Sequence, residues 1–431
     1  MNKIITLIPA LAAGLWLASC NSEENSINDY ELNYKITEVK AKENIPVGCL
    51  LYNPYGDLND AGRWERLEEP YDPATGKIGP NMVPKAGVYR FMGNTKDEEL
   101  LNEFSIQIGR MVEEMKVAGV DFVLTPATRE SSNLYPNNIN PEDSIFLNMI
   151  SGRTTNLAWK NDGSMKFALQ INMQNFAASA GFDQSTSSLE RRPDQIYTIK
   201  DKEGNILETV TMTQWDRFLS YASNLARYMN EPTYYRTSDG RPVVYLREPD
   251  KFFVENVKAF YDDFREAIQK VCGANPYIIC SLKNWDIVPR YQYTVLNGMP
   301  DAICPRNMAD MRADLDRFYI WKVLHNENFK KNESYLAENF PTIDFIPSVS
   351  AGHCEYVMNI NYRYPNLLPN SADIRTRCWI AKMHLPKQPM VILDSFNDWG
   401  HANFFETSDP EHGNGVGDEF LKVIRSEFKL N

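Results

Sequence analysis

Runs of basic residues are missing from this sequence, and no stretch holds more than two consecutive lysines or arginines. The 431 residues include 45 lysines and arginines against 57 aspartates and glutamates, which gives a formal net charge of −12. Proteins that bind nucleic acids usually carry a net basic face, because cations must neutralise the phosphates. The charge balance therefore argues against a nucleic acid as partner.

Several catalytic motifs are also missing. The chain holds no GxSxG nucleophile elbow, no HExxH zinc motif and no Walker A phosphate loop. None of its seven cysteines stands in a CxxC or zinc-type spacing. We therefore expect no resident metal and no other cofactor, and we expect most of the cysteines to be small buried hydrophobic residues. Cys272 and Cys280 could instead form a disulfide in an oxidising compartment.

Long apolar runs are confined to the amino terminus, where Ile4–Trp16 follows a short basic start. The next residues, Leu17-Ala18-Ser19-Cys20, complete a pattern that resembles a bacterial lipoprotein signal, whose cysteine receives lipid after cleavage. The alternative is an ordinary secretory signal that happens to end in cysteine. We expect a lipoprotein signal peptide over residues 1–20, a membrane anchor through lipidated Cys20, and a flexible tether over residues 21–45. The protein would then lie on the bacterial outer membrane or cell surface.

The rest of the chain repeats one pattern, in which a short β-rich run precedes an amphipathic helical stretch. Eight such runs lack clean alternation of polar and apolar residues, which is typical of strands buried on both faces. The runs are Val47–Tyr52, Val120–Thr125, Lys166–Asn172, Pro242–Leu246, Tyr277–Ser281, Ala302–Cys304, Phe345–Val349 and Met390–Asp394. The helical stretches include Glu98–Ala118, Thr213–Met229, Phe252–Val271 and Met311–Asn326. Eight strands alternating with helices predict an α/β fold, a (β/α)8 TIM barrel, in a single domain over residues 46–431.

Two intervals are longer than the other loops of the predicted barrel. Glu68–Gly93, rich in glycine, proline and tyrosine, follows the first strand, and Gln195–Met212, after the third, is predicted to form a β-hairpin. Both insertions follow the carboxyl end of a strand, where loops build the active face of a barrel. An open doubly wound sheet is the alternative. It needs a glycine-rich phosphate loop after its first strand, and Asn53-Pro54-Tyr55-Gly56-Asp57 stands there instead.

Polar and aromatic residues follow most of the predicted strands. Since the carboxyl ends of barrel strands meet at one face, we expect these residues to surround one site. The candidate substrate-binding residues are Tyr52, Asn53, Tyr55, Trp64, Glu130, Asn172, Arg247, Glu248, Trp285, Arg306, Asn307, His353, Asn397 and Trp399. Carboxylates, amides and arginines bind hydroxyl groups and aromatic rings stack on sugar rings, so the set indicates a carbohydrate ligand. For any single residue, the alternative is an ion pair at the barrel rim.

The segment after the last predicted strand carries a family resemblance. Asn397-Asp398-Trp399-Gly400-His401, with Glu406 close behind, resembles the last-strand motif of the glycoside hydrolase family 99 endo-α-mannosidases and the related WbsX-type proteins. It is also similar to a motif of the family 71 α-1,3-glucanases. Tyr52-Asn53-Pro54-Tyr55 and the segment Tyr235–Tyr245 are similar to WbsX-type chains at the corresponding strands. The resemblance implies a TIM-barrel hydrolase that cleaves glycosidic bonds in an oligo- or polysaccharide.

The resemblance also implies catalytic positions. In family 99, two glutamates three residues apart carry the chemistry, and they correspond to Asp398, as a base, and His401, as the acid/base. Glu406 is a further catalytic candidate. Aspartate shortens the reach by one methylene, and histidine, with an ordinary pKa of about 6.5, changes the acid. The sequence therefore differs from family 99 at the two positions that carry the chemistry in that family.

Three interpretations follow from this departure. The first is a glycosidase in which Asp398 works with a second carboxylate, the candidates being Glu406, Glu130 and Glu248. The second is a catalytically impaired barrel that binds glycans at the cell surface. The third is a non-carbohydrate enzyme, such as a metal-dependent hydrolase that uses His353, His401 and Asp398.

Overall fold

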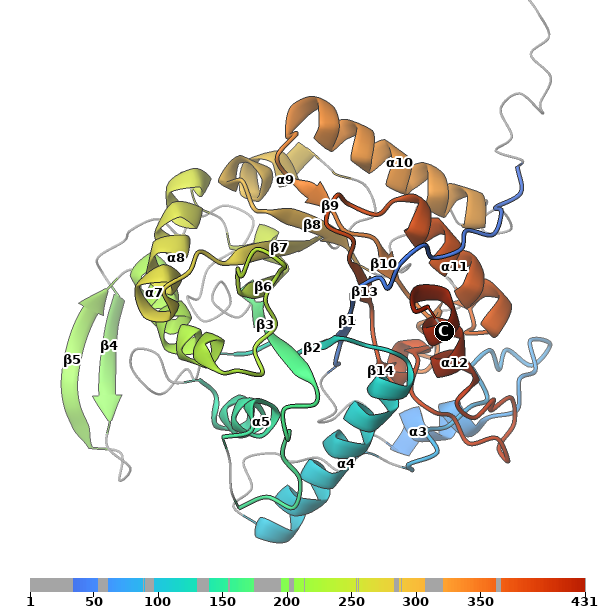
Figure 1. Ribbon diagram of the computed structural model, residues 1–431. Helices are drawn as coiled ribbons and strands as arrows, with labels where there is room; N and C mark the ends of the chain where they lie inside the picture. Colours follow the sequence, from blue (N-terminus) through green and yellow to red (C-terminus); the bar gives the residue numbers. More distant parts are fainter. Residues whose placement is uncertain are drawn as a thin grey trace, which may run out of the picture.

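The computed structural model describes residues 34–52, 61–87, 89, 97–129, 139–153, 156–173, 195–200, 205–212, 214–252, 254, 256–282, 287, 289–306, 321–361 and 366–430. A ring of parallel strands lies at its centre, with helices around it (Figure 1).

The order of the central strands closes them into a barrel. The order is β10-β13-β1-β2-β3-β6-β7-β8-β9, and each neighbouring pair is parallel. The strands are β1 (Val47–Leu50), β2 (Phe122–Leu124), β3 (Lys166–Asn172), β6 (Val243–Arg247), β7 (Tyr277–Leu282), β8 (Ala302–Pro305), β9 (Asp344–Phe345), β10 (Ser348–Val349) and β13 (Val391–Leu393). The two ends of this order, β9 and β10, are consecutive parts of one extended stretch, so the sheet closes on itself. The predicted (β/α)8 barrel is confirmed, and each of the eight predicted strands is present.

A proline splits the seventh strand of the barrel. The predicted strand Phe345–Val349 is present as β9 and β10, with Ile346 and Pro347 between them. Pro347 has no backbone N–H and cannot donate to a neighbouring strand. Its carbonyl still accepts the N–H of Ile392 at 3.1 Å, and the N–H of Ile346 donates to the carbonyl of Ile303 at 2.9 Å. The first half therefore pairs with β8 and the second half with β13.

Helices cover the outside of the barrel. They are α3 (Ala61–Glu68), α4 (Glu98–Val117), α5 (Pro141–Ser151), α7 (Gln214–Ala226), α8 (Val257–Cys272), α9 (Pro289–Thr294), α10 (Trp321–Asn339), α11 (Ser371–Met383) and α12 (Glu419–Phe428). Helix α4 buries a stripe that includes Phe104, Ile108 and Met111, as its apolar spacing predicts. The carboxylate of Asp97 accepts the N–H groups of Glu99 and Leu100 and caps this helix.

One predicted helix ends later in the chain than expected. The prediction was Met311–Asn326, whereas α10 continues to Asn339. Beyond Asn326 the buried positions include the polar Asn332 beside Phe329, so the apolar repeat is too weak to mark the helix. Residues 311–320 of the prediction lie outside the described residues.

Both insertions lie where the sequence places them. The hairpin consists of β4 (Gln195–Lys200) and β5 (Ile206–Met212), which pair antiparallel and project from the barrel (Figure 1). The insertion after β1 folds against the end of the chain that follows β13. The carbonyl of Val83 accepts the N–H of Asp409, and Lys85 N–H donates to the carbonyl of Thr407. This insertion therefore reaches the segment that carries the predicted catalytic residues.

The part of the expected tether that the structure describes packs on the domain. Tyr34 Oη donates to Glu327 Oε1 at 2.7 Å, and Ile36 and Ile45 are buried. Ile45 N–H also donates to the carbonyl of Phe428. A tether that begins at residue 21 would therefore end before Tyr34 rather than at residue 45. Residues 1–33, with the expected signal and Cys20, lie outside the described part.

Two further features concern the described residues as a whole. None of their helices is long and apolar enough to cross a bilayer. The six cysteines among them are free, and Cys272 Sγ donates to the carbonyl of Ala274 rather than bonding to Cys280.

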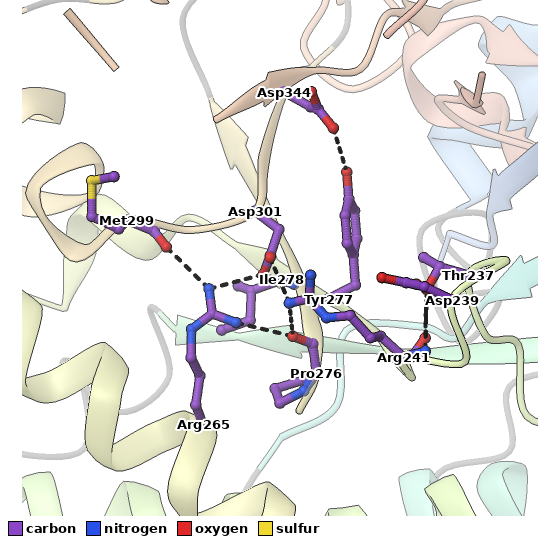
Figure 2. A network of polar contacts seen from close by, with 10 residues as sticks. All are labelled: Thr237, Asp239, Arg241, Arg265, Pro276, Tyr277, Ile278, Met299, Asp301 and Asp344. Carbon is purple, nitrogen blue, oxygen red and sulfur yellow. Dashed lines mark hydrogen bonds and ion pairs between the residues drawn. The ribbon is translucent and has the colours of Figure 1, made fainter. Parts of the chain in front are cut away.

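A half-buried ionic network ties together the amino ends of β6, β7 and β8 (Figure 2). Asp301 accepts hydrogen bonds from Arg241 Nη2 at 2.5 Å and from the N–H of Ile278 at 2.9 Å, and it pairs with Arg265 Nη2 at 2.8 Å. In TIM barrels this end of the strands serves stability, whereas the opposite end carries the active site. We therefore assign the network a structural role.

Candidate active site

A tight turn beyond β13 brings two predicted catalytic residues into contact. Strands β14 (Asn397–Asp398) and β15 (Asn403–Phe404) pair antiparallel, and the one-turn 3-10 helix Trp399–His401 joins them. Asp398 accepts the backbone N–H of His401 at 3.2 Å, and its two carboxylate oxygens lie 2.8 and 2.9 Å from His401 Nδ1. Both oxygens of one carboxylate therefore face a single ring nitrogen.

This contact changes the roles expected of the pair. Burial alone would raise the pKa of Asp398, but His401, together with His353, lowers that pKa below its ordinary value. Asp398 is thus an ionised partner that fixes the orientation of the imidazole, as in other carboxylate–histidine pairs. The His401 side chain is 25% exposed against 7% for Asp398, so the imidazole is the member that a ligand can reach.

Three other predicted residues surround this dyad. His353, in β11 (His353–Cys354), stacks its ring on that of His401 at 5.7 Å between centroids and 11° between planes. Tyr52 presents its ring edge-on to His401 at 6.4 Å. Asn397 Oδ1 accepts the N–H of Tyr52 at 2.8 Å, which fixes the chain just past β1. The ends of the first, seventh and eighth predicted strands therefore meet at one place.

Arg306 connects the dyad to carboxylates from other strands. It follows β8, and its Nη1 lies 3.2 Å from Glu248 Oε1, beyond β6. Burial would lower the pKa of Arg306, but the charges of Asp394, Glu248 and Asp398, with Tyr245, raise it. Three carboxylates from two sides of the barrel therefore lie within electrostatic reach of one guanidinium.

Glu248 also has a strained backbone. Its φ is 52° and its ψ is 50°, a left-handed conformation that residues other than glycine and asparagine adopt rarely. Such strain collects at functional sites. The neighbouring Arg247 has a lowered pKa because of burial and the charge of Arg306. Both residues were predicted, and the structure places both beside Arg306.

Asp394 was not among the predicted site residues. It closes the eighth predicted strand, is 4% exposed, and raises the pKa of Arg306. The sequence could have identified it, because Asp394 is a carboxylate directly after the apolar run Val391–Leu393. A residue at that position faces the mouth of a barrel.

Glu406 lies beneath the turn rather than in the mouth. It is 1% exposed, it accepts hydrogen bonds from the Tyr89 hydroxyl and from Trp399 Nε1 at 2.8 Å, and its Oε1 lies 3.9 Å from Arg110 Nη2. Burial and the charge of Glu114 raise its pKa to about 7, against the opposing effects of Tyr89, Trp399 and Arg110. Glu406 therefore has no surface for a ligand and is a positioning residue for the turn.

Trp399 is likewise internal. Only 1% of it is exposed, and its indole stacks on Phe404 at 3.5 Å between ring centroids. It therefore offers no face to a sugar ring, contrary to the prediction. Its place in the turn between Asp398 and His401 makes it the link through which Glu406 holds the dyad.

Asn403 clamps the two histidine-bearing segments together. Its Oδ1 accepts the N–H of Ala351 at 2.9 Å, and its Nδ2 donates to the carbonyl of Asp394 at 2.6 Å. The buried Arg377 donates to the carbonyl of Ala351. The backbone that leads to His353 is thereby fixed to the backbone that leads to His401.

The remaining predicted residues fall into two groups. Trp64 lies in α3 and donates to Glu68 Oε1, and Asn172 ends β3 with its N–H donating to the carbonyl of Thr128. Asn53, Tyr55, Glu130, Trp285 and Asn307 lie outside the described residues. Within the described part of the chain, no group of three or more histidines, cysteines, aspartates and glutamates is arranged to hold a metal ion.

Comparisons with known proteins address the fold. No protein-family model matches the chain, and no curated protein matches it. Among solved structures, the chain is similar to a glycoside hydrolase-like protein, with a TM-score of 0.68, 20% identity, and coverage of 94% of this chain and 99% of the other. It is also similar to the family 99 endo-alpha-mannosidase of Bacteroides thetaiotaomicron in complex with bis-tris propane, with a TM-score of 0.50, 13% identity, and coverage of 90% and 97%. At these identities the likeness establishes the fold, and the chain has a fold like that of glycoside hydrolase family 99.

Proposed function

We propose that the protein is a glycoside hydrolase that cleaves glycosidic bonds in a glycan bound at the carboxyl end of its barrel. The observation that carries the proposal is the Asp398–His401 dyad, which lies within electrostatic reach of Arg306 and its carboxylates. The similarity of the fold to glycoside hydrolases supports the same class of reaction.

Hydrolysis of a glycosidic bond needs a proton for the leaving oxygen and a carboxylate near the anomeric carbon. We assign the proton to Nε2 of His401, because Asp398 occupies Nδ1 and favours the charged imidazolium. The oxygen of a water molecule then bonds to the anomeric carbon. The proton that this water loses replaces the proton that His401 gave to the leaving oxygen.

We assign the carboxylate to Glu248. Its backbone is strained and Arg306 Nη1 lies 3.2 Å from its Oε1, which fixes the orientation of the carboxylate. Asp394 is more deeply buried and acts on the charge of Arg306 from inside the barrel. The two catalytic groups thus come from opposite parts of the barrel rather than from one motif.

The substrate and location are proposed on different grounds. Because the family 99 structure is named an endo-alpha-mannosidase, α-mannan is the first substrate to test. The pattern around Cys20 supports a lipid-anchored protein at the bacterial cell surface, acting on an extracellular glycan.

A glycan-binding barrel without activity is the second candidate. It is favoured by the hydrogen bonds between Asp398 and His401. These residues stand at the positions of the two family 99 glutamates, and their pairing turns two separate catalytic groups into one. In that case the mouth would hold a sugar chain but would lack two independent catalytic groups.

The test is to incubate protein lacking residues 1–20 with α-mannan and α-glucan and to size the products. We expect cleavage of one polymer, a loss of about 10²-fold or more in His401→Ala and Glu248→Gln, and a smaller loss in Asp398→Asn. Glu406→Gln serves as a control that leaves the mouth intact. Binding without cleavage by the unaltered protein would favour the second candidate.

A further inference from the structure

A cleft of about 690 Å³ lies outside the barrel, between α4 and α12. These two helices lie side by side at the edge of the ring (Figure 1). The volume falls within the range of about 300–1,000 Å³ that is typical of small-molecule sites. Its walls come from the first insertion, the middle and end of α4, the segment after β15 and the start of α12.

The charged side chains in the cleft balance one another. Lys85 and Arg110 are cations, and Glu114 and Asp418 are carboxylates. A lining with no net charge does not select a strongly ionic ligand. Cations donate hydrogen bonds and carboxylates accept them, so hydroxyl groups, which do both, satisfy such a mixed set. The lining also includes Val117 and other small apolar residues, which suit the C–H faces of a sugar ring.

Two of these charged groups are held in place before any ligand arrives. Glu114 Oε2 accepts the N–H of Thr407 at 2.9 Å. Arg110 Nη2 lies 3.9 Å from Glu406 Oε1, and in the described structure neither atom has a hydrogen-bond partner. The charge of Glu406 therefore attracts one edge of the Arg110 guanidinium and orients it. The Arg110 side chain as a whole is 40% exposed. Such preorganisation lowers the entropy lost on binding.

We propose that this cleft is a second carbohydrate-binding site, separate from the barrel mouth, that takes a short neutral stretch of the glycan. The class of ligand rests on the proposed function, whereas the site itself rests on the cleft and its fixed polar groups. Arg110 and Glu114 bind hydroxyl groups, and Val117 contacts the sugar face. A chain of sugars held there keeps the polymer on the protein between cleavage events.

The test fills the cleft with a bulky side chain. Val117 lines the cleft and Ile106 does not, yet both are exposed on α4, at 48% and 58%. We would introduce Val117→Trp and, as a matched control, Ile106→Trp, each together with His401→Ala to prevent cleavage. Binding of soluble α-mannan would be measured by affinity electrophoresis. Lys85→Ala, at an exposed position, serves as a second variant if Val117→Trp fails to fold.

We expect Val117→Trp to weaken binding of α-mannan about tenfold relative to Ile106→Trp, and Lys85→Ala to weaken it about threefold. Equal binding by the two tryptophan variants, or no binding of α-mannan to His401→Ala, would overturn the proposal. Hydrolysis by the protein with His401 intact is scored separately. If the protein cleaves α-mannan but Val117→Trp does not weaken binding, the proposed function is supported and the second site is refuted. If Val117→Trp weakens binding but the protein cleaves nothing, the second site is supported and the proposed function is refuted.

Discussion

Replacing Glu406 with glutamine should stabilise the folded protein at neutral to alkaline pH. The pKa of Glu406 rises from 4.5 to about 7 in the folded state, chiefly through burial. The folded state therefore holds this proton more tightly than the unfolded state, and its stability falls as the pH rises through the window between these values. Glutamine stays neutral, so the variant avoids this loss.

The size of the effect follows from the two pKa values. A change from 4.5 to about 7 corresponds to about 3 kcal/mol, fully developed near pH 8 and absent near pH 4. The amide oxygen of Glu406→Gln can still accept from Trp399 Nε1 and the Tyr89 hydroxyl, so the turn should keep its shape. Because Glu406 contacts no ligand in this account, activity should fall less than about tenfold.

Urea denaturation of both proteins at pH 4 and pH 8 measures the effect. The free energy of unfolding should be higher for Glu406→Gln at pH 8 and equal for the two proteins at pH 4. A variant that is no more stable at pH 8, or a difference that does not change with pH, would refute the reasoning. Loss of activity by 10²-fold or more in a folded Glu406→Gln would return Glu406 to the catalytic group.

Two further substitutions test the frame around the site. Asp301→Ala should destabilise the fold by about 2–4 kcal/mol, because two half-buried arginines lose their carboxylate partner and the N–H of Ile278 loses its acceptor. Asp262→Ala, at a 56% exposed ion pair, should change stability by less than about 0.5 kcal/mol. Equal effects in a denaturation experiment would remove the structural role of the network. Asn403→Ala should cost about 2–4 kcal/mol, because the N–H of Ala351 and the carbonyl of Asp394 lose their partners. A fully stable and fully active Asn403→Ala would show that this clamp is dispensable.

The barrel strands could be predicted because burial on both faces leaves a mark in composition. Runs such as Tyr277–Leu282 are almost wholly apolar, and no other element of a soluble domain requires this over so few residues. Pro347 could also be recognised in the sequence as a residue that interrupts a strand. Its effect on the sheet could not be predicted, because it depends on which neighbouring strand each half pairs with. The extent of α10 could not be predicted, because buried polar residues such as Asn332 weaken its pattern.

The site was predictable where its members are close in sequence. Asp398 and His401 lie three residues apart and could be named, yet their mutual hydrogen bonds depend on the conformation of the turn. Glu406 could not be separated from the catalytic residues, because one of its partners, Tyr89, lies 317 residues away. Asp394 directly follows the apolar run Val391–Leu393, but its place near Arg306 depends on the closure of the barrel, which brings the ends of β8 and β13 together.

The most direct test of the account is whether His401 supplies the proton to the leaving group. On the glycan that the protein cleaves, two aryl glycosides of the same sugar would be compared, one with dinitrophenol and one with phenol as leaving group. A good leaving group needs no protonation, so His401→Ala should lose about 10²-fold or more in kcat/KM on the phenyl glycoside and less than about tenfold on the dinitrophenyl glycoside. Equal losses on both substrates would contradict the assignment of His401 as the acid and, with it, the central role of the Asp398–His401 dyad.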